Sequence, residues 1–501
     1  MVDDLLVAAG HEPLARHGRA RRSGLSAAAA VNAVVAWAGA FGLVTGWVDL
    51  GERINDRLPF DSPLLAGFAL VMFVAMPLTL LAWSAWQGAA RTNDLAFITG
   101  LMLIGWVVVQ VVVLRSFSLL QPLYLCVGAG FVTASHRVHL SPPRRGVLMV
   151  ILGALVAATG VGLAPHLVKV GLSPTSVVSV VLVLTGIALL GAGARSALRN
   201  RRLAVKLVGG GFVLIVVLLS VSLIAPAVAA TNVPTTHVTD TPSSRGIDHD
   251  DITLTTPDGV DLAGWYMKAG DADDVNATDG AGVVVLHGAG ATRSDVLDQS
   301  AVLVEHGYAV LLLDARGHGD SRGTAMDFGW YGDLDVAAGI EFLASRPEID
   351  PRRIGVVGFS MGGEEAIGAA ATDPRVRAVV AEGATGRQAA DKAWLSDAFG
   401  WRGWVQEQLE HVQDGITDFL TDASPPMSLR TAVDVADDTR FLLITAGNVD
   451  DEGRAAEFIQ SGASERVTVW TIDGTDHTGG YDAQPQQWEQ RVVEFLDESL
   501  T

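Results

Sequence analysis

Long apolar stretches fill the first 230 residues, and they limit what this chain can fold into more than any other feature. As helices, stretches of about 17 to 25 apolar residues match the thickness of the hydrocarbon core of a bilayer. None of the candidate stretches contains Asp or Glu, and short loops separate them. The sequence therefore predicts an α-helical transmembrane bundle over residues 1–230. About seven spans are expected: 25–48, 62–86, 95–114, 117–135, 146–165, 174–194 and 207–230.

Basic residues are distributed unevenly over the loops of this bundle. One side carries thirteen Arg and Lys, and the other carries four: Arg53, Arg57, Arg115 and Lys169. Because cytoplasmic loops carry the excess of Lys and Arg, we expect the amino terminus in the cytoplasm. Seven spans then place the chain beyond residue 230 outside the cytoplasm, and an even number of spans reverses this. The expected location is the cell membrane, as a multi-pass protein.

The charge balance changes after the last span. Residues 1–230 carry 17 Lys and Arg against 8 Asp and Glu, whereas the rest of the chain carries 18 against 47. Phosphates are repelled by such an acidic half, so we expect no nucleic-acid partner. The single cysteine, Cys126, permits neither an intrachain disulfide nor a cysteine-based metal site. We expect no metal and no cofactor.

The halves are joined by a polar segment, residues 231–246 (TNVPTTHVTDTPSSRG), which is rich in Pro and Thr and predicts an extended linker. In residues 247–501, short apolar runs alternate with helical segments. This alternation predicts a mostly parallel sheet with helices on both faces. Eight runs are typical of strands: DITLTT, DLAGWYMK, GVVVLH, AVLLLD, IGVVGF, RAVVAE, FLLITAG and VTVWTI.

One insertion, about residues 384–436, is too long for a simple crossover and predicts a helical cap over a site. Trp394 and Phe399 lie near its start. Apolar residues then recur at helical spacing, and they either dock the cap on the core or line an apolar acyl pocket. They are Trp401, Trp404, Val405, Leu409, Val412, Ile416, Phe419 and Leu420.

A serine lies between two glycines in the stretch IGVVGFSMGGEEAIGAAA, residues 354–371. The β-branched run predicts a buried strand, and the segment after it is rich in helix formers. A tight strand-to-helix turn exposes the Ser360 hydroxyl and leaves the first helical amides free. Ser360 is therefore the candidate nucleophile. The backbone amides of Met361 and of Ala289, in the glycine turn after GVVVLH, are the candidate oxyanion donors.

A serine hydroxyl is a poor nucleophile without a base and an oriented partner. His477 follows the strand VTVWTI, and Asp450 follows the strand RFLLITAG. We expect His477 to take the Ser360 proton, and Asp450 to fix the imidazole tautomer and stabilise its cation. Asp451 and Glu382 are the alternatives for the acid.

Residues 250–500 resemble the α/β-hydrolase superfamily, and more narrowly its dienelactone-hydrolase and serine-aminopeptidase-like branches. The resemblance covers about half of the chain and is carried by LHGAG, LLLDARGHGDS, IDPRRIGVVGFSMGG, LLITAGNVDD and DGTDHTGGY. It implies the α/β-hydrolase fold and the chain order serine, acid, histidine. The acid loop departs from the usual pattern, since it reads GNVDDEG.

We expect a membrane-bound serine hydrolase that cleaves a carboxylic ester or thioester through an acyl-enzyme on Ser360. Its expected substrate is a small or lipid-like ester. An aminopeptidase-like amidase is the alternative, with Glu364, Glu365 or Glu382 as the anchor for the substrate amine. An alternative of another class is a non-catalytic membrane sensor or scaffold that keeps only the fold.

Overall fold

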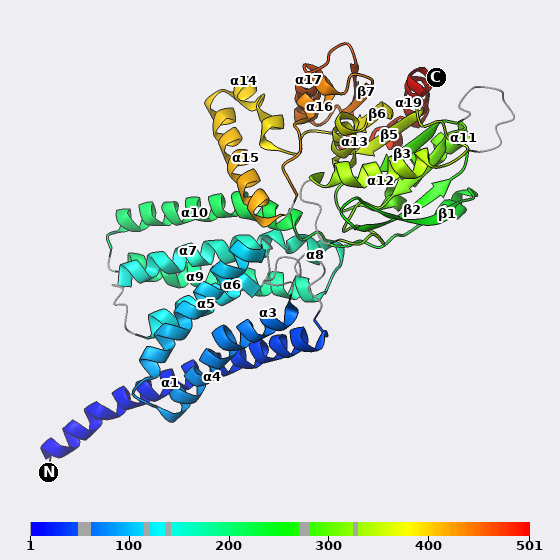
Figure 1. Ribbon diagram of the computed structural model, residues 1–501. Coiled ribbons are helices and arrows are strands. Elements are labelled where there is room, and N and C mark those ends of the chain that lie inside the picture. Colours follow the sequence, from blue (N-terminus) through cyan, green and yellow to red (C-terminus); the bar gives the residue numbers. More distant parts are fainter. Residues whose placement is uncertain are drawn as a thin grey trace. The chain divides into compact units, whose positions relative to one another are not determined.

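The structure is a computed structural model that describes residues 2–48, 62–114, 120–135, 142–199, 201–269, 280–323, 329–421 and 423–500 (Figure 1). By the contacts within it, the chain divides into two compact units. One consists of Met1–Gly160 and Val181–Val221, and the other of Val161–Val180 and Ser222–Thr501.

Apolar helices make up the amino-terminal part. They are α1 (Val2–Thr45), α3 (Pro63–Leu70), a π-helical turn (Val71–Ala75), α4 (Met76–Gln87), α5 (Thr92–Leu114), α6 (Leu120–Ala134), α7 (Pro142–Gly162), α8 (Ala164–Lys169), α9 (Pro174–Leu198) and α10 (Leu203–Ala230). Among the described residues, six segments are long and apolar enough to cross a membrane: Ser23–Thr45, Pro63–Gln87, Thr92–Gln110, Pro142–Lys169, Pro174–Leu198 and Leu203–Ala230.

The span expected at 117–135 is a shorter apolar helix, Gln121–Ala134. It packs closely on α5, where a Cβ on Gly100 would lie 2.6 Å from the Gly128 oxygen, so only glycine lets these backbones approach. Four loop residues used to predict the orientation lie outside the described residues: Arg53, Arg57, Arg115 and Arg137. The orientation therefore stays a prediction.

An eight-stranded sheet forms the centre of the carboxy-terminal part, and each predicted strand is found in it (Figure 1). The spatial order is β1-β2-β4-β3-β5-β6-β7-β8. β2 runs antiparallel to both neighbours, and the pairs from β4 to β8 are parallel. The strands are β1 (Asp250–Thr255), β2 (Asp261–Met267), β3 (Gly282–Leu286), β4 (Ala309–Leu313), β5 (Ile354–Phe359), β6 (Val376–Glu382), β7 (Arg440–Ala446) and β8 (Val467–Ile472).

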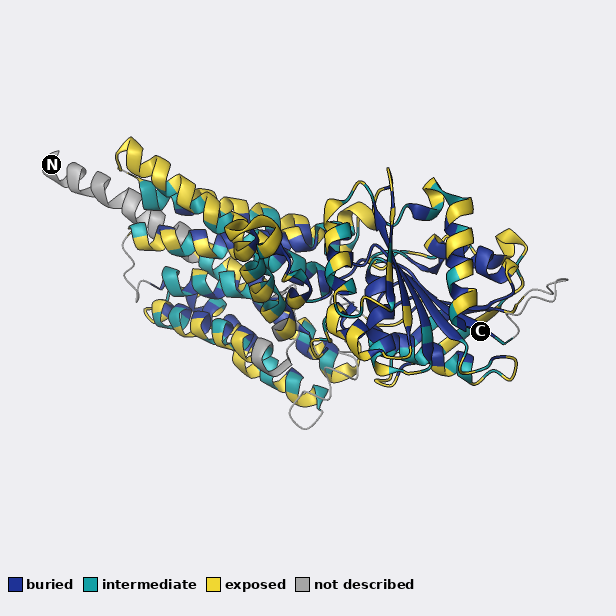
Figure 2. Cartoon of the chain, turned by 90° about the horizontal axis from the view of Figure 1, so that it is seen from above, coloured by how far each residue is buried: buried dark blue, intermediate teal, exposed yellow. Residues whose placement is uncertain are grey.

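Helices cover both faces of the sheet, and the central strands are buried (Figure 2). One face packs against α12 (Gly332–Ala344), α13 (Met361–Thr372), α16 (Leu429–Val435) and α17 (Asp450–Gln460). The other packs against α11 (Leu297–Glu305) and α19 (Pro485–Leu500). Shorter helical turns among the described residues include Pro242–Arg245, Arg293–Val296, Ala389–Lys392 and α18 (Gly480–Ala483). Continuous apolar runs form these strands because both of their faces are buried.

The predicted cap segment contains α14 (Leu395–Phe399) and α15 (Trp401–Leu420). Trp394 is buried, whereas the side chains of Trp401, Trp404, Val405 and Val412 are exposed. These four side chains therefore neither dock the helix on the core nor line a closed pocket. The side chains of Phe419 and Leu420 lie outside what the structure describes.

Candidate active site

Ser360 occupies the turn between β5 and α13, as the sequence predicts. Its backbone has φ 53° and ψ −119°, a positive-φ conformation that residues other than glycine rarely adopt. The backbone amide of Ser360 donates to the backbone carbonyl oxygen of Glu382 at 2.7 Å, which fixes the turn to the end of β6. The strained turn therefore projects the hydroxyl from the carboxyl edge of the sheet.

Glycines on both sides of Ser360 let the turn close. A Cβ on Gly358 would lie 2.1 Å from the Gly362 oxygen, and a Cβ on Gly362 would lie 2.7 Å from the oxygens of Leu286 and His287. These distances are too short for any larger residue. The first turn of α13 thus sits directly against the end of β3, which brings the Ser360 turn beside the turn after β3.

His477 reaches Ser360 from the loop after β8. Its Nε2 lies 2.8 Å from the Ser360 Oγ, and its Nδ1 lies 2.6 Å from Oε1 of Glu452. Because a carboxylate accepts, Nδ1 carries the proton and Nε2 is free to accept the Ser360 hydroxyl proton. The three side chains form one continuous hydrogen-bonded chain. The structure thus brings Ser360 and His477 together as expected.

The carboxylate in this chain corrects the sequence-based assignment. Asp450 and Asp451 are exposed at the start of α17, whereas Glu452 is 1% exposed and contacts His477. The alternative Glu382 is occupied elsewhere, since its carboxylate accepts from the Gly480 amide at 2.8 Å and from the Trp488 indole at 2.9 Å.

The helix explains why the third acidic residue is the one that reaches the histidine. Asp450, Asp451 and Glu452 are the first three residues of α17. A glutamate at the third helical position can fold back toward the segment before the helix. Glu452 does so, and its Oε2 accepts from the Ala446 amide at 2.8 Å. The sequence feature that points to Glu452 is the run of three acidic residues, from which the sequence analysis names only Asp450 and Asp451 as candidates.

Glu382 anchors the segment that follows His477 through hydrogen bonds to its carboxylate. It ends β6, is buried, and ties α18 and α19 to the sheet through Gly480 and Trp488. Burial raises its pKa, and the two hydrogen bonds lower it by a smaller amount. Gly383, the next residue, has φ 73°, and a Cβ there would lie 2.8 Å from the His477 ring. This edge of the sheet therefore fits closely around the imidazole.

Backbone amides at two turns are available to an oxyanion. Within the described part of the chain, the amides of Met361 and Ala289 make no hydrogen bond. A Cβ on Gly288 would lie 3.2 Å from the Ser360 Cβ, so the Ala289 turn is adjacent to the nucleophile. Both predicted donors are thus unpaired amides next to Ser360, the arrangement that an oxyanion site needs.

Two buried histidines hold the Ala289 turn. His287 donates through Nδ1 to the Gly288 oxygen at 2.8 Å and accepts at Nε2 from the Ala315 amide at 3.0 Å. The Nε2 of His318 accepts from the Gly290 amide at 2.9 Å. Burial lowers the pKa of both rings, to about 3 for His318, so both are neutral at pH 7. They act on the turn as fixed, uncharged hydrogen-bonding groups.

The hydrogen bond to Glu452 raises the pKa of His477 above its ordinary value, and partial burial opposes this.

Two glutamates lie in the first turns of α13, close to Ser360. Burial raises the pKa of Glu365 well above that of a free glutamate. Its Oε2 is buried without a partner among the described residues. Glu364, beside it in α13, accepts from the amides of Thr385 and Gly386 at 3.0 and 2.8 Å.

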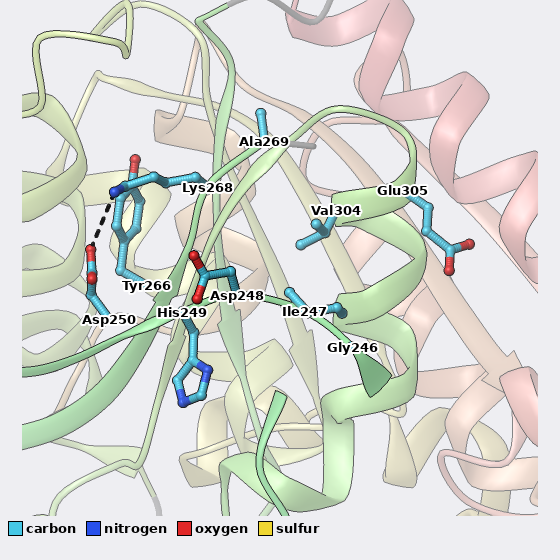
Figure 3. A pocket seen from close by; sticks show the side chains of 10 residues that line it. All are labelled: Gly246, Ile247, Asp248, His249, Asp250, Tyr266, Lys268, Ala269, Val304 and Glu305. Atoms are coloured by element: carbon cyan, nitrogen blue, oxygen red, sulfur yellow. Dashed lines mark ion pairs between the residues drawn. The ribbon is translucent and has the colours of Figure 1, made fainter. Parts of the chain in front are cut away.

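A separate cavity of about 550 Å³ lies beside β1, the end of β2 and the end of α11 (Figure 3). Lys268 and Asp250, which form an ion pair at 3.7 Å, line it together with His249, Tyr266 and Glu305. It shares no residue with the Ser360 chain of hydrogen bonds. We take Ser360 as the site, because there alone a nucleophile, a base and an acid are in contact within the described residues. In the same residues no three His, Cys, Asp or Glu side chains gather as metal ligands.

Comparison with known proteins agrees with this fold. Residues 282–432 match the family model for the alpha/beta hydrolase fold. The chain is 32% identical over 124 residues to an uncharacterized protein of Mycobacterium tuberculosis, covering 25% of this chain and 42% of that protein. It is 34% identical over 140 residues to the thiohydrolase aneE of Aspergillus aculeatus, covering 26% of this chain and 40% of that protein.

A solved esterase of Pyrococcus furiosus aligns with 54% of this chain and 99% of its own, with 24% identity and a TM-score of 0.44. The chain spans about two fifths of the length of the two curated relatives. The predicted fold class is confirmed: an α/β-hydrolase fold with a mostly parallel eight-stranded sheet follows a series of long apolar helices.

Proposed function

We propose that this chain, which has the α/β-hydrolase fold in its carboxy-terminal part, is a membrane-tethered serine hydrolase. It cleaves carboxylic esters or thioesters through an acyl-enzyme on Ser360. The observation that carries the proposal is the unbroken hydrogen-bonded chain from Ser360 Oγ through His477 to Glu452, at 2.8 and 2.6 Å. This is the arrangement that turns a hydroxyl into a nucleophile.

In the first half-reaction, Ser360 Oγ attacks the carbonyl carbon of the substrate while His477 Nε2 takes the hydroxyl proton. The carbonyl oxygen becomes an oxyanion that accepts from the amides of Met361 and Ala289. Glu452 stabilises the imidazolium. The intermediate collapses, and the proton on Nε2 passes to the departing alcohol or thiol.

In the second half-reaction, water replaces the leaving group. His477 takes a proton from water as the water attacks the acyl carbon, and the second oxyanion uses the same two amides. Collapse then breaks the bond to Ser360, and Nε2 returns the proton to Oγ. The free acid leaves, and the site is restored.

The amidase alternative is disfavoured by the state of the three candidate anchors for an amine. Glu364 and Glu382 already accept two hydrogen bonds each from the protein. Glu365 is buried, and burial raises its pKa, which disfavours the charged form that a cation needs. The scaffold alternative offers no reason to keep Ser360, His477 and Glu452 in contact. The relative named a thiohydrolase supports keeping thioesters in the substrate class.

Covalent labelling tests the proposal. The full chain in detergent is treated with a fluorophosphonate, and hydrolysis is followed with esters and thioesters of graded acyl length. Wild type and the control Ser464→Ala, an exposed serine of the same part, should label and turn over equally. Ser360→Ala should do neither while keeping its unfolding temperature. Full turnover by Ser360→Ala refutes the nucleophile, and absence of labelling and turnover in the wild type refutes the function.

A further inference from the structure

Helix α15 uses polar side chains on one side to contact the fold and exposes large apolar side chains on another side. On the inner side, Glu407 accepts from the Ser396 amide at 2.7 Å, and Asp414 accepts from the Ala389 amide at 2.5 Å. Thr417, on the same side, is fully buried. The helix is therefore held to the fold by hydrogen bonds to its polar face, the reverse of the usual amphipathic arrangement.

The outer side carries large apolar residues. Trp401 is 76% exposed, Trp404 57% and Val412 49%, and Val405 lies between them. At about 100° per residue these four positions fall within an arc of about 100° that also holds Gln408 and Gly415, on the side away from Asp414 and Thr417. We call them the outer apolar face of α15. Two exposed Trp and two exposed Val side chains gathered on one side of a helix mark a surface that meets an apolar partner.

We propose that the outer apolar face of α15 docks on the lipid bilayer that the chain's own helices cross. The last apolar helix ends at Ala230, and the sheet begins at Asp250. The linker 231–246 has 16 residues and spans at most about 55 Å when fully extended. The bilayer is thus the apolar surface permanently present near α15, at a high effective concentration.

The chemistry of the face fits the membrane–water boundary. Tryptophan is enriched there, because its ring is apolar and its indole N–H is polar. Charge does not drive the contact, since residues 231–501 carry 47 acidic against 18 basic residues. Docking therefore depends on insertion of Trp and Val rather than on anionic headgroups, so zwitterionic lipid suffices and added salt does not release it.

Depth-sensitive quenching tests the docking in the full chain. In a Cys126→Ala background, an environment-sensitive fluorophore is attached at Val405→Cys, or at Gln490→Cys as a control on an exposed position of α19. Each protein is placed singly in phosphatidylcholine nanodiscs. We expect the Val405→Cys probe to be quenched by nitroxide-labelled lipid and sheltered from aqueous iodide. The Gln490→Cys probe should show the opposite.

Two results overturn the docking. One is a Val405→Cys probe that iodide reaches as readily as the control and that labelled lipid does not quench. The other is a probe sheltered from both quenchers, which shows that protein covers the face. Comparing discs that hold one copy with discs that hold two then shows whether the covering protein is a second copy or another part of the same chain.

A kinetic arm links the docking to catalysis, and this arm rests on the proposed function. Trp401→Ser/Trp404→Ser should hydrolyse a long-chain ester held in the bilayer at least about tenfold more slowly than wild type, because the site no longer stays at the lipid surface. Its rate on a short, water-soluble ester should be unchanged. Equal rates of both proteins on the bilayer ester refute the link. If wild type cleaves neither ester, the proposed function fails while the quenching result still decides the docking.

Discussion

Replacing Glu452 by glutamine tests the acid of the site with almost no change in shape. Two donors converge on this carboxylate: the Ala446 amide on Oε2 and His477 Nδ1 on Oε1. Glutamine offers one acceptor and one NH₂ group. If its oxygen keeps Ala446, its NH₂ faces Nδ1, and the imidazole is stable only with its proton on Nε2. That tautomer cannot accept the Ser360 proton.

The expected loss is therefore large. In the best-studied serine triad, the acid-to-amide change lowers kcat roughly 10⁴-fold, which corresponds to about 5.5 kcal/mol of transition-state stabilisation. We expect a loss of about 10³- to 10⁴-fold in kcat for Glu452→Gln. Asp450→Asn and Asp451→Asn, on exposed positions of the same turn, should stay within about twofold of wild type.

The assay measures kcat and kcat/KM against pH on variants with matched unfolding temperatures, so that lost stability does not imitate lost catalysis. The base works as neutral imidazole, so kcat/KM rises as pH passes through the His477 pKa. Since the contact with Glu452 raises that pKa, the residual activity of Glu452→Gln should have its rising limb at lower pH. Wild-type kcat in Glu452→Gln, or an inactive Asp450→Asn, refutes this reasoning.

Two further predictions concern the membrane topology and a buried acid. Protease added to intact cells stripped of any outer layer should cut within 231–246 and release the acidic part; protection until the cells are lysed reverses the proposed orientation. Glu365→Gln should raise the midpoint of thermal unfolding at pH 8 and have little effect near pH 4. The raised pKa of Glu365 means that the wild type loses stability as pH rises from the unfolded value of about 4.3 toward the folded one, and glutamine has no proton to lose. An equal difference at both pH values contradicts this.

Local patterns were enough to predict most of the fold. Apolar runs bounded by turn residues predicted all eight strands, because a strand buried on both faces must be apolar throughout. The Gly358 and Gly362 spacing located the Ser360 turn, since its close backbone contacts admit no other residue. His477 was predicted from its position in the loop after the last strand.

The acid and the outer face of α15 depended on geometry that the sequence pattern does not contain. Three consecutive acids are equivalent in a pattern, and only the direction of the first turn of α17 selects Glu452. The apolar period of α15 was recognised, but a period does not say which side meets the protein. That side was decided by Glu407 and Asp414, which bond to backbone amides of Ser396 and Ala389.

The buried link from Glu382 to Trp488 has a consequence for biosynthesis. α19 packs across β5 and β6 through Trp488, Leu496 and Leu500, and Trp488 anchors the glutamate that also holds the histidine loop. A nascent chain that has reached residue 480 already contains the serine, the glutamate and the histidine, but not the helix that fixes their scaffold. The scaffold of the Ser360 site is therefore completed only when α19, Pro485–Leu500, has been made, after all the apolar helices of residues 1–230.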